Sequence, residues 1–371
     1  MARRTAIAAA TILLFGVVTV YFSYPSEEVF DRFYYGRDSE DFLSETPDPV
    51  FSALEPQTSL IAIVSVLDSS SSESKYRTAM NSMKCYAIRN NYTYLVVNGD
   101  EHNKTCTHKD ITFQRHCIIA HLLEAFEWIV FVDADIGVVN ENVRLEHFTR
   151  PDADLIFYDR FFNHEIMAGS YFVKKSNFSV DFLHRWADYE FRLPGGLHGR
   201  DQGAIHNTFQ MLMVELFAPA SALRPRCEWL WRNSSDYGTL SRFTVCCREV
   251  LQAANFSNVH VYEKGTGWAR DGWLTNSHWN PDVDFMFHAR KEADKIRYKP
   301  ADIGKLTGLE YFPWFDTLSS PVRIEQCGHE LQSWPHDRNL IASKSLILRH
   351  LAARKRKIDE EYRRLVQGLM I

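Results

Sequence analysis

Residues 128–135 have the sequence WIVFVDAD, in which five apolar residues precede two carboxylates separated by one residue. A short apolar run of this kind predicts a buried strand, as in parallel sheets. Side chains at i and i+2 of an extended chain point the same way, so Asp133 and Asp135 can converge on one ligand. Converging carboxylates repel each other unless a positive ligand lies between them. A hard divalent cation bound to a nucleotide diphosphate meets this need, so the sequence predicts a metal–diphosphate site here.

Two further Asp-x-Asp triplets, at residues 152–154 and 282–284, serve as internal controls. Each follows a proline and precedes an apolar run, so each opens a strand. Ligands of open α/β sheets bind outside the carboxyl ends of strands, and only Asp133 and Asp135 follow a strand. We therefore assign the site to that pair and expect structural roles for the other two triplets.

The composition is that of a globular protein with a large core. The chain has 371 residues, of which 45% are hydrophobic and 24% are charged, with a formal net charge of -5. These values suit one large domain or two ordinary ones. The overall charge gives no indication of a nucleic-acid-binding surface.

An uncharged apolar run occupies residues 5–22, directly after Arg3 and Arg4. Its 18 residues are at the short end for a membrane span and long for the core of a signal peptide. Positive charge before the run and acidic residues after it, from Glu27 on, place residues 1–4 in the cytosol. We expect a signal-anchor transmembrane helix over 5–22, with a cleaved signal peptide as the alternative. In both cases the rest of the chain is lumenal or extracellular.

The N-glycosylation sequons and the cysteines are also consistent with a lumenal or extracellular location. Acceptor triplets for N-glycosylation begin at Asn91, Asn103, Asn177, Asn233 and Asn255. The seven cysteines include no Cys-x-x-Cys pair, which disfavours zinc and favours disulfides formed in an oxidising lumen. They are Cys85, Cys106, Cys117, Cys227, Cys246, Cys247 and Cys327. The odd count leaves at least one thiol free or paired between chains, and it allows a homodimer.

The pattern along the chain predicts an α/β fold. Residues 23–58 are acidic, contain prolines and lack sustained periodicity, which is typical of a stem. The body, residues 59–300, opens with apolar runs at 60–67 and 94–97, each followed by a segment of helical periodicity, before the strand at 128–132. This alternation predicts a single domain with a mostly parallel mixed sheet flanked by helices.

Further strands are expected at 155–158 and 169–173, and Ser176 can cap the helix that follows. The C-terminal extension, residues 301–371, is irregular at first and ends in a basic helix over about 340–367. This helix either packs one face on the body or contacts an anionic membrane surface or a partner.

His288 closes the apolar run that begins at Val283. Alternation places Asp284, Met286 and His288 on one face of the expected strand. A histidine at this position can supply a nitrogen ligand to the ion held by Asp133. The alternative is a hydrogen-bonded structural histidine.

Residues 197–205 place a charged cluster between two glycines, ahead of an apolar helix. Asp201 can cap this helix, with Gln202 in its first turn. The functional alternative places Asp201 and Gln202 beside the reacting centre, where a carboxylate and an amide support developing positive charge on a sugar.

Residues 265–273 combine glycines with two tryptophans and an Arg/Asp pair. As contacts to the cofactor, Trp268 can stack on a sugar ring and Arg270 can bind a phosphate, while the glycines permit a loop to close. The alternative is that the aromatic residues pack in the core.

These segments together resemble those of a known family. They are the strand with Asp133 and Asp135, AGSYFV at 168–173, RDQGAI at 200–205, GWARDGW at 267–273 and FMFH at 285–288. Over about residues 58–300 the chain resembles a family expanded in nematodes, long catalogued as a domain of unknown function and assigned to nucleotide-diphospho-sugar transferases. More distantly, it is similar to the retaining galactosyl-, xylosyl- and mannosyltransferases of the Golgi.

The resemblance implies a Rossmann-like glycosyltransferase domain of the A type in a type II Golgi membrane protein. The metal would be Mn²⁺ or Mg²⁺, held by Asp133, Asp135 and His288, and the donor a nucleotide-diphosphate sugar, most simply a UDP-sugar. Asp201 and Gln202 would lie beside the anomeric carbon, with retention of its configuration. The acceptor would be a glycan, glycoprotein or glycolipid. The chain departs from the pattern of these relatives at Arg200, the residue before Asp201, where they often carry a second acid. The departure bears on the role of Asp201.

Two other functions share parts of this pattern. Phosphotransferases with an aspartyl-phosphate intermediate also use an apolar strand that ends in Asp-x-Asp, but there the pair follows an early strand. An inactive or glycan-binding lumenal protein would keep the fold without turnover. The presence of Asp133, Asp135 and His288 together favours the transferase.

Overall fold

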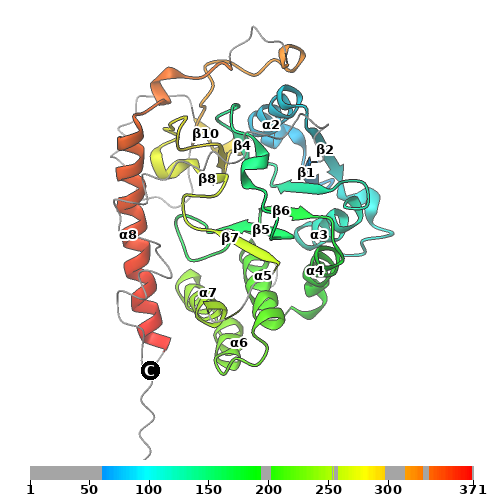
Figure 1. Ribbon diagram of the computed structural model, residues 1–371, viewed down its shortest axis with the longest axis vertical. Coiled ribbons are helices and arrows are strands. Elements are labelled where there is room, and N and C mark those ends of the chain that lie inside the picture. Colours follow the sequence, from blue (N-terminus) through cyan, green and yellow to red (C-terminus); the bar gives the residue numbers. More distant parts are fainter. Residues whose placement is uncertain are drawn as a thin grey trace, which may run out of the picture. The chain divides into compact units, whose positions relative to one another are not determined.

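Short apolar runs, most of them buried along their whole length, build a six-stranded sheet in the computed structural model (Figure 1). The strand order is β2-β1-β3-β6-β5-β7. The strands are β1 (Ile61–Leu67), β2 (Thr93–Asn98), β3 (Trp128–Val132), β5 (Leu155–Tyr158), β6 (Ser170–Lys174) and β7 (Val259–Tyr262). Pairs β1–β2, β1–β3 and β5–β7 are parallel, whereas β6 runs antiparallel to both of its neighbours. The prediction of a mostly parallel mixed sheet is confirmed.

The structure describes residues 61–193, 202–252, 254, 258–296, 314–328 and 334–369, and of residues 202–205 only the backbone. All of them belong to one compact unit, residues 50–371. The predicted cytosolic end, anchor and stem lie outside these ranges. Within them, no helix has both the length and the apolar character needed to span a membrane.

Strand β6 is antiparallel because the link from β5 is short. Residues 159–169 contain no crossover helix, and Asp159 and Ile166 form an antiparallel bridge inside the link. In contrast, α2 and α3 connect β1, β2 and β3 and keep these three strands parallel.

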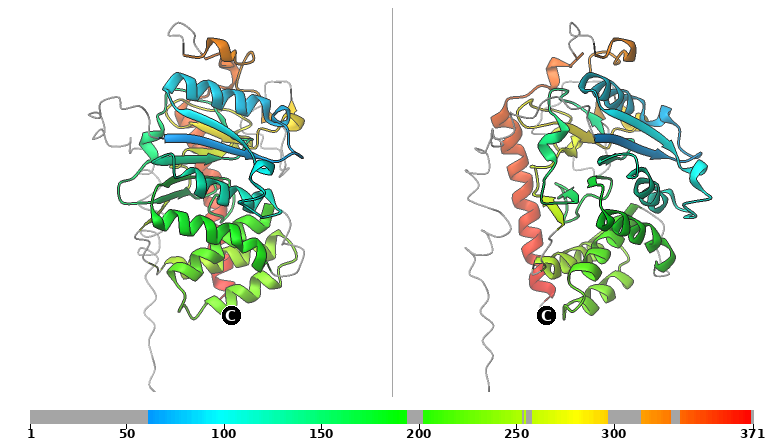
Figure 2. Two further views of the ribbon diagram at one scale, coloured as in Figure 1. Left: turned by 90° about the vertical axis from the view of Figure 1, so that its right-hand side faces the viewer. Right: turned by 45° about the vertical axis from the view of Figure 1, so that its right-hand side comes forward.

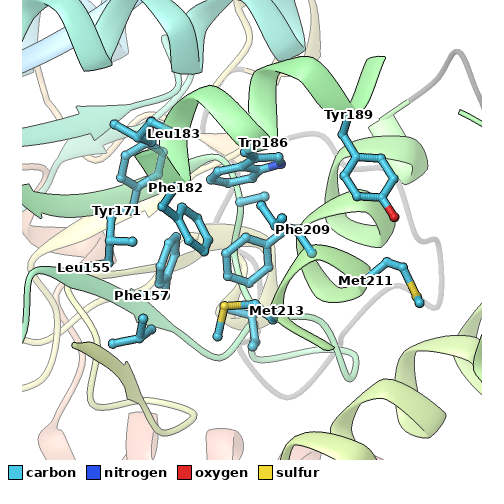
Figure 3. Packing of buried hydrophobic residues seen from close by; sticks show 14 of the residues in the cluster. Leu155, Phe157, Tyr171, Phe182, Leu183, Trp186, Tyr189, Phe209, Met211 and Met213 are labelled. Atoms are coloured by element: carbon cyan, nitrogen blue, oxygen red, sulfur yellow. The ribbon is translucent and has the colours of Figure 1, made fainter. Parts of the chain in front are cut away.

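Helices cover one face of the sheet with an aromatic core (Figures 1 and 3). They are α3 (Ile111–Leu122), α4 (Asn177–Ala187), α5 (Gln202–Phe217), α6 (Arg224–Arg232) and α7 (Tyr237–Gln252). Phe157 and Tyr171 from the sheet pack with Phe182 and Trp186 of α4 and with Phe209 of α5. The Ser176 side chain caps α4 by accepting a hydrogen bond from the backbone N–H of Ser179, as predicted.

Helix α2 (Arg77–Asn90) and a small sheet cover the other face. The small sheet has the order β4-β9-β8 and consists of β4 (Gly137–Val138), β8 (Ala269–Asp271) and β9 (Met286–His288). A further pair joins β10 (Lys295–Ile296) and β11 (Trp314–Phe315). Because β4 follows β3 by only a short turn, the small sheet lies at the carboxyl end of β3.

The long helix α8 (Lys344–Leu369) packs one face on the body and runs beside α7 (Figures 1 and 2). Its buried residues Ile347, Leu351, Ile358 and Tyr362 are spaced as one helical stripe. Of the two roles considered for this helix, packing on the body is therefore present in the structure.

Three disulfides confirm the prediction for the cysteines. They are Cys85–Cys327, Cys106–Cys117 and Cys227–Cys246. Cys247 is free and buried. The odd count is thus explained within one chain.

Candidate active site

The three predicted metal ligands come together at the carboxyl end of β3. Asp133 and Asp135 follow the last residue of that strand, and His288 ends β9 of the small sheet. Their ligand atoms all lie within 4.8 Å of one another. Nε2 of His288 lies 3.4 Å from Oδ1 of Asp135. Residues from two distant parts of the sequence therefore form one cluster.

Asp271 orients the imidazole of His288. The two residues are register partners in β8 and β9, and Oδ1 of Asp271 lies 2.9 Å from Nδ1 of His288. A carboxylate at this nitrogen favours the tautomer whose Nε2 lone pair faces the other two carboxylates. Although burial alone would raise the pKa of Asp271, the charge of Arg160 and the hydrogen bond with His288 hold that pKa well below its ordinary value. Asp271 is therefore an ionised orienting group.

The donor set fits a divalent cation. Burial raises the pKa of Asp135, His288 opposes this rise, and the Asp133 carboxylate adds to it. The buried carboxylate thus lacks full compensation for its charge. Two carboxylates and one imidazole that is hydrogen-bonded from behind are a ligand set typical of divalent metal ions.

Arg115 and Gly169 fix the position of Asp133. Nη1 of Arg115, on α3, donates to Oδ1 of Asp133 at 2.6 Å. The backbone N–H of Asp133 donates to the carbonyl of Gly169 at 2.8 Å. A Cβ at position 169 would lie only 2.1 Å from Oδ2 of Asp133. Gly169 is required here because it leaves room for the carboxylate.

We therefore expect Gly169→Ala to displace the Asp133 carboxylate and to weaken Mn²⁺ binding by about 10-fold or more. Titration of the full chain with Mn²⁺, followed by electron paramagnetic resonance, measures this affinity. Gly368→Ala is the matched control, because a Cβ at that position meets no atom within 4 Å. Wild-type affinity in the Gly169 variant would show that Asp133 needs no such fixed position.

Trp268 and Arg270 belong to the scaffold of the small sheet in this structure. The Trp268 side chain is 1% exposed, packs against Tyr158 and Phe172, and donates from Nε1 to Oγ of Ser170 at 2.8 Å. Arg270 is 7% exposed and pairs with Asp284 at 2.6 Å. The geometry favours packing, the alternative to the predicted cofactor contacts.

The structure says little about the two predicted catalytic residues. Gln202 is the first residue of α5, and only its backbone is described, whereas Asp201 lies outside the described residues. Their placement beside the reacting sugar stays a prediction.

A polar cavity of about 380 Å³ lies at the same edge of the large sheet as the metal-ligand cluster, because β1 and β3 are parallel. It follows the carboxyl ends of β1 and β2, where Asp68 and Asp100 stand, and Gln114 of α3 lines it. The next residue, Arg115, reaches Asp133. The remaining lining residues are Ser69, Asn103, Thr107, His108, Lys109 and Ile111. Reasoning from the sequence missed this cavity, although an aspartate directly after β1 was a usable signal.

Comparisons with known proteins identify a family without an assigned function. No curated protein matches this chain. Eight chains of solved structures match, among them the crystal structure of a glycosyltransferase involved in the glycosylation of the major capsid of PBCV-1. That protein is 14% identical, the alignment covers 62% of this chain and 92% of that one, and the TM-score is 0.37. Residues 83–303, more than half of the chain, match the family described as "Protein of unknown function, DUF273", and the chain therefore belongs to that family.

Proposed function

We propose that the protein is a metal-dependent glycosyltransferase that moves a sugar from a nucleotide-diphosphate donor to a glycan or glycoconjugate acceptor. The observation that carries this proposal is the cluster of Asp133, Asp135 and His288, with Asp271 behind the histidine. A histidine held in this way is typical of metal ligands.

The polar cavity at the ends of β1 and β2 supports a nucleotide sugar as the donor, with the nucleoside diphosphate as the leaving group. Ligands of open α/β sheets bind at the carboxyl ends of the strands, and the cavity joins the ends of β1 and β2 to the helix that carries Arg115. The nucleoside is proposed to bind in this cavity, with its diphosphate directed to the cation at Asp133. Lys291, whose positive charge already lowers the pKa of Asp135, adds a cation on the side of His288.

In the proposed mechanism, the side chains around the cluster position its ligands. Arg115 holds Asp133, and Asp271 holds His288, so that the cation ligands are positioned before the donor arrives. A bound divalent cation supplies Lewis-acid neutralisation of the departing diphosphate. Asp201 and Gln202 are proposed to support positive charge on the sugar from the other side, with retention.

We further propose a lumenal location, in the Golgi, with residues 5–22 as the membrane anchor. Three disulfides support an oxidising compartment. The described sequon asparagines, Asn91, Asn103, Asn177 and Asn233, are all exposed and accessible to glycosylation.

The test is release of nucleoside diphosphate from a panel of nucleotide sugars by the full chain made in a secretory host. The panel is run with Mn²⁺ and with chelator, in the presence of mixed glycoprotein and glycolipid acceptors. We expect one donor to be consumed, and only when the metal is present. Folded protein that binds Mn²⁺ but consumes no donor would contradict transfer and favour a glycan-binding role.

A further inference from the structure

Arg160 connects the orienting carboxylate to a second buried carboxylate. It lies in the link between β5 and β6, and its side chain is 18% exposed. Nη2 lies 3.5 Å from Oδ1 of Asp271, and Nη1 lies 3.3 Å from Oε2 of Glu165. One guanidinium therefore bridges two acidic groups, and the first of them contacts His288.

The backbone around Arg160 is held from two sides. The Lys264 ammonium donates to the carbonyl oxygens of Arg160 and Asn163. Arg248 of α7 forms a bidentate pair with Asp159, at 2.6 and 2.7 Å. These contacts fix the backbone of the link from which the Arg160 side chain reaches Asp271.

Glu165 holds the other end of the guanidinium and continues the connection to α5. Its Oε2 lies 3.9 Å from Nδ1 of His206, which also lies 3.2 Å from the carbonyl of Ile166. His206 lies one turn after Gln202, the first residue of that helix. The chain of contacts runs from the proposed metal ligand through Asp271, Arg160 and Glu165 to His206 of α5.

We propose that Arg160 is a positioning residue, which acts through Asp271 to keep Nε2 of His288 directed at the metal. This inference rests on the proposed function only for the presence of a metal at the cluster. An arginine suits the task because its planar fork reaches both carboxylates at once, whereas a lysine offers one point charge.

The test is the Mn²⁺ affinity of the full chain, measured by electron paramagnetic resonance with no donor or acceptor present. We expect Arg160→Gln to weaken binding by about 10-fold, the scale on which partners of metal-binding histidines act. The matched control is Arg150→Gln, which breaks an exposed pair with Asp152 and is expected to bind Mn²⁺ as the wild type does.

A double-variant cycle separates positioning from a general structural role. If Arg160 acts through Asp271, then Arg160→Gln causes no further loss in an Asp271→Asn background. Additive losses, or wild-type affinity in the folded single variant, would overturn the proposal. Arg160→Lys replaces the glutamine variant if the latter does not fold, and undiminished affinity in folded Arg160→Lys overturns the proposal equally.

The Mn²⁺ affinities of the wild type and of the Arg160 variants distinguish failure of the positioning role from failure of the proposed function. If the wild type binds Mn²⁺ and the Arg160 variants bind it equally well, only the positioning role is lost. If the wild type binds no Mn²⁺, the metal site itself is refuted, and both proposals are lost with it.

Discussion

Replacement of Asp135 by alanine is expected to abolish both Mn²⁺ binding and donor turnover. The variant leaves one carboxylate and one imidazole, too few protein ligands to hold a cation against water. Loss of several kcal/mol of transition-state stabilisation corresponds to a decrease in turnover of roughly 1000-fold or more. Calorimetric titration with Mn²⁺ and the nucleoside diphosphate assay measure the two effects.

Thermal unfolding supplies an independent measurement on the same variant. A ligand that binds only the folded state raises the melting temperature, so Mn²⁺ is expected to stabilise the wild type but not Asp135→Ala. Asp282→Ala is the matched control, because it removes an exposed aspartate from another Asp-x-Asp triplet. Equal stabilisation of wild type and Asp135→Ala by the metal would refute the assignment of this residue.

Arg270→Gln is expected to lower the free energy of unfolding strongly. Arg270 and Asp284 form a buried pair at 2.6 Å, and Arg270 also donates to Oγ1 of Thr275 and to the carbonyl of His278. Removing one partner leaves the other charge buried and uncompensated, which costs about 3 to 5 kcal/mol of unfolding free energy. Denaturant unfolding of the metal-free protein measures this loss.

Two controls test the cause of that loss. Arg185→Gln breaks an exposed pair with Asp181 and should change stability by less than about 0.5 kcal/mol. Adding Asp284→Asn to Arg270→Gln removes the uncompensated charge and should restore part of the lost stability. Full stability in Arg270→Gln, together with weakened donor binding, would instead support the predicted contact of Arg270 with the cofactor.

Local patterns in the sequence predict much of this fold. The apolar run before Asp133 becomes β3, and the Ser176 cap starts α4, because both depend only on neighbouring residues. Asp133 and Asp135 also cluster, as predicted, but a turn in which the Ile136 N–H donates to the Asp133 carbonyl brings them together, and not the alternation of an extended strand. The addition of His288 to the cluster needed the resemblance to a family as well as the pattern.

Other features depend on partners that are distant in the sequence. The direction of β6 depends on how the chain after β5 turns, and no local signal specified that turn. Asp271 meets His288 only through the register of β8 and β9. The choice between packing and ligand contact for Trp268 depends on burial, which residue type alone cannot decide.

The disulfide between Cys85 and Cys327 has a practical consequence for dissecting the protein. A fragment cut at residues 83 and 303, the limits of the family match, would begin inside α2 and lack β1, an interior strand of the sheet. Cys85 would become an unpaired thiol. Loss of α8 would uncover Phe161 and Leu274, which pack with Ile347 and Leu351. A version made for experiments should therefore extend from before Ile61 to Leu369, so that it keeps β1, the disulfide and the contacts of α8.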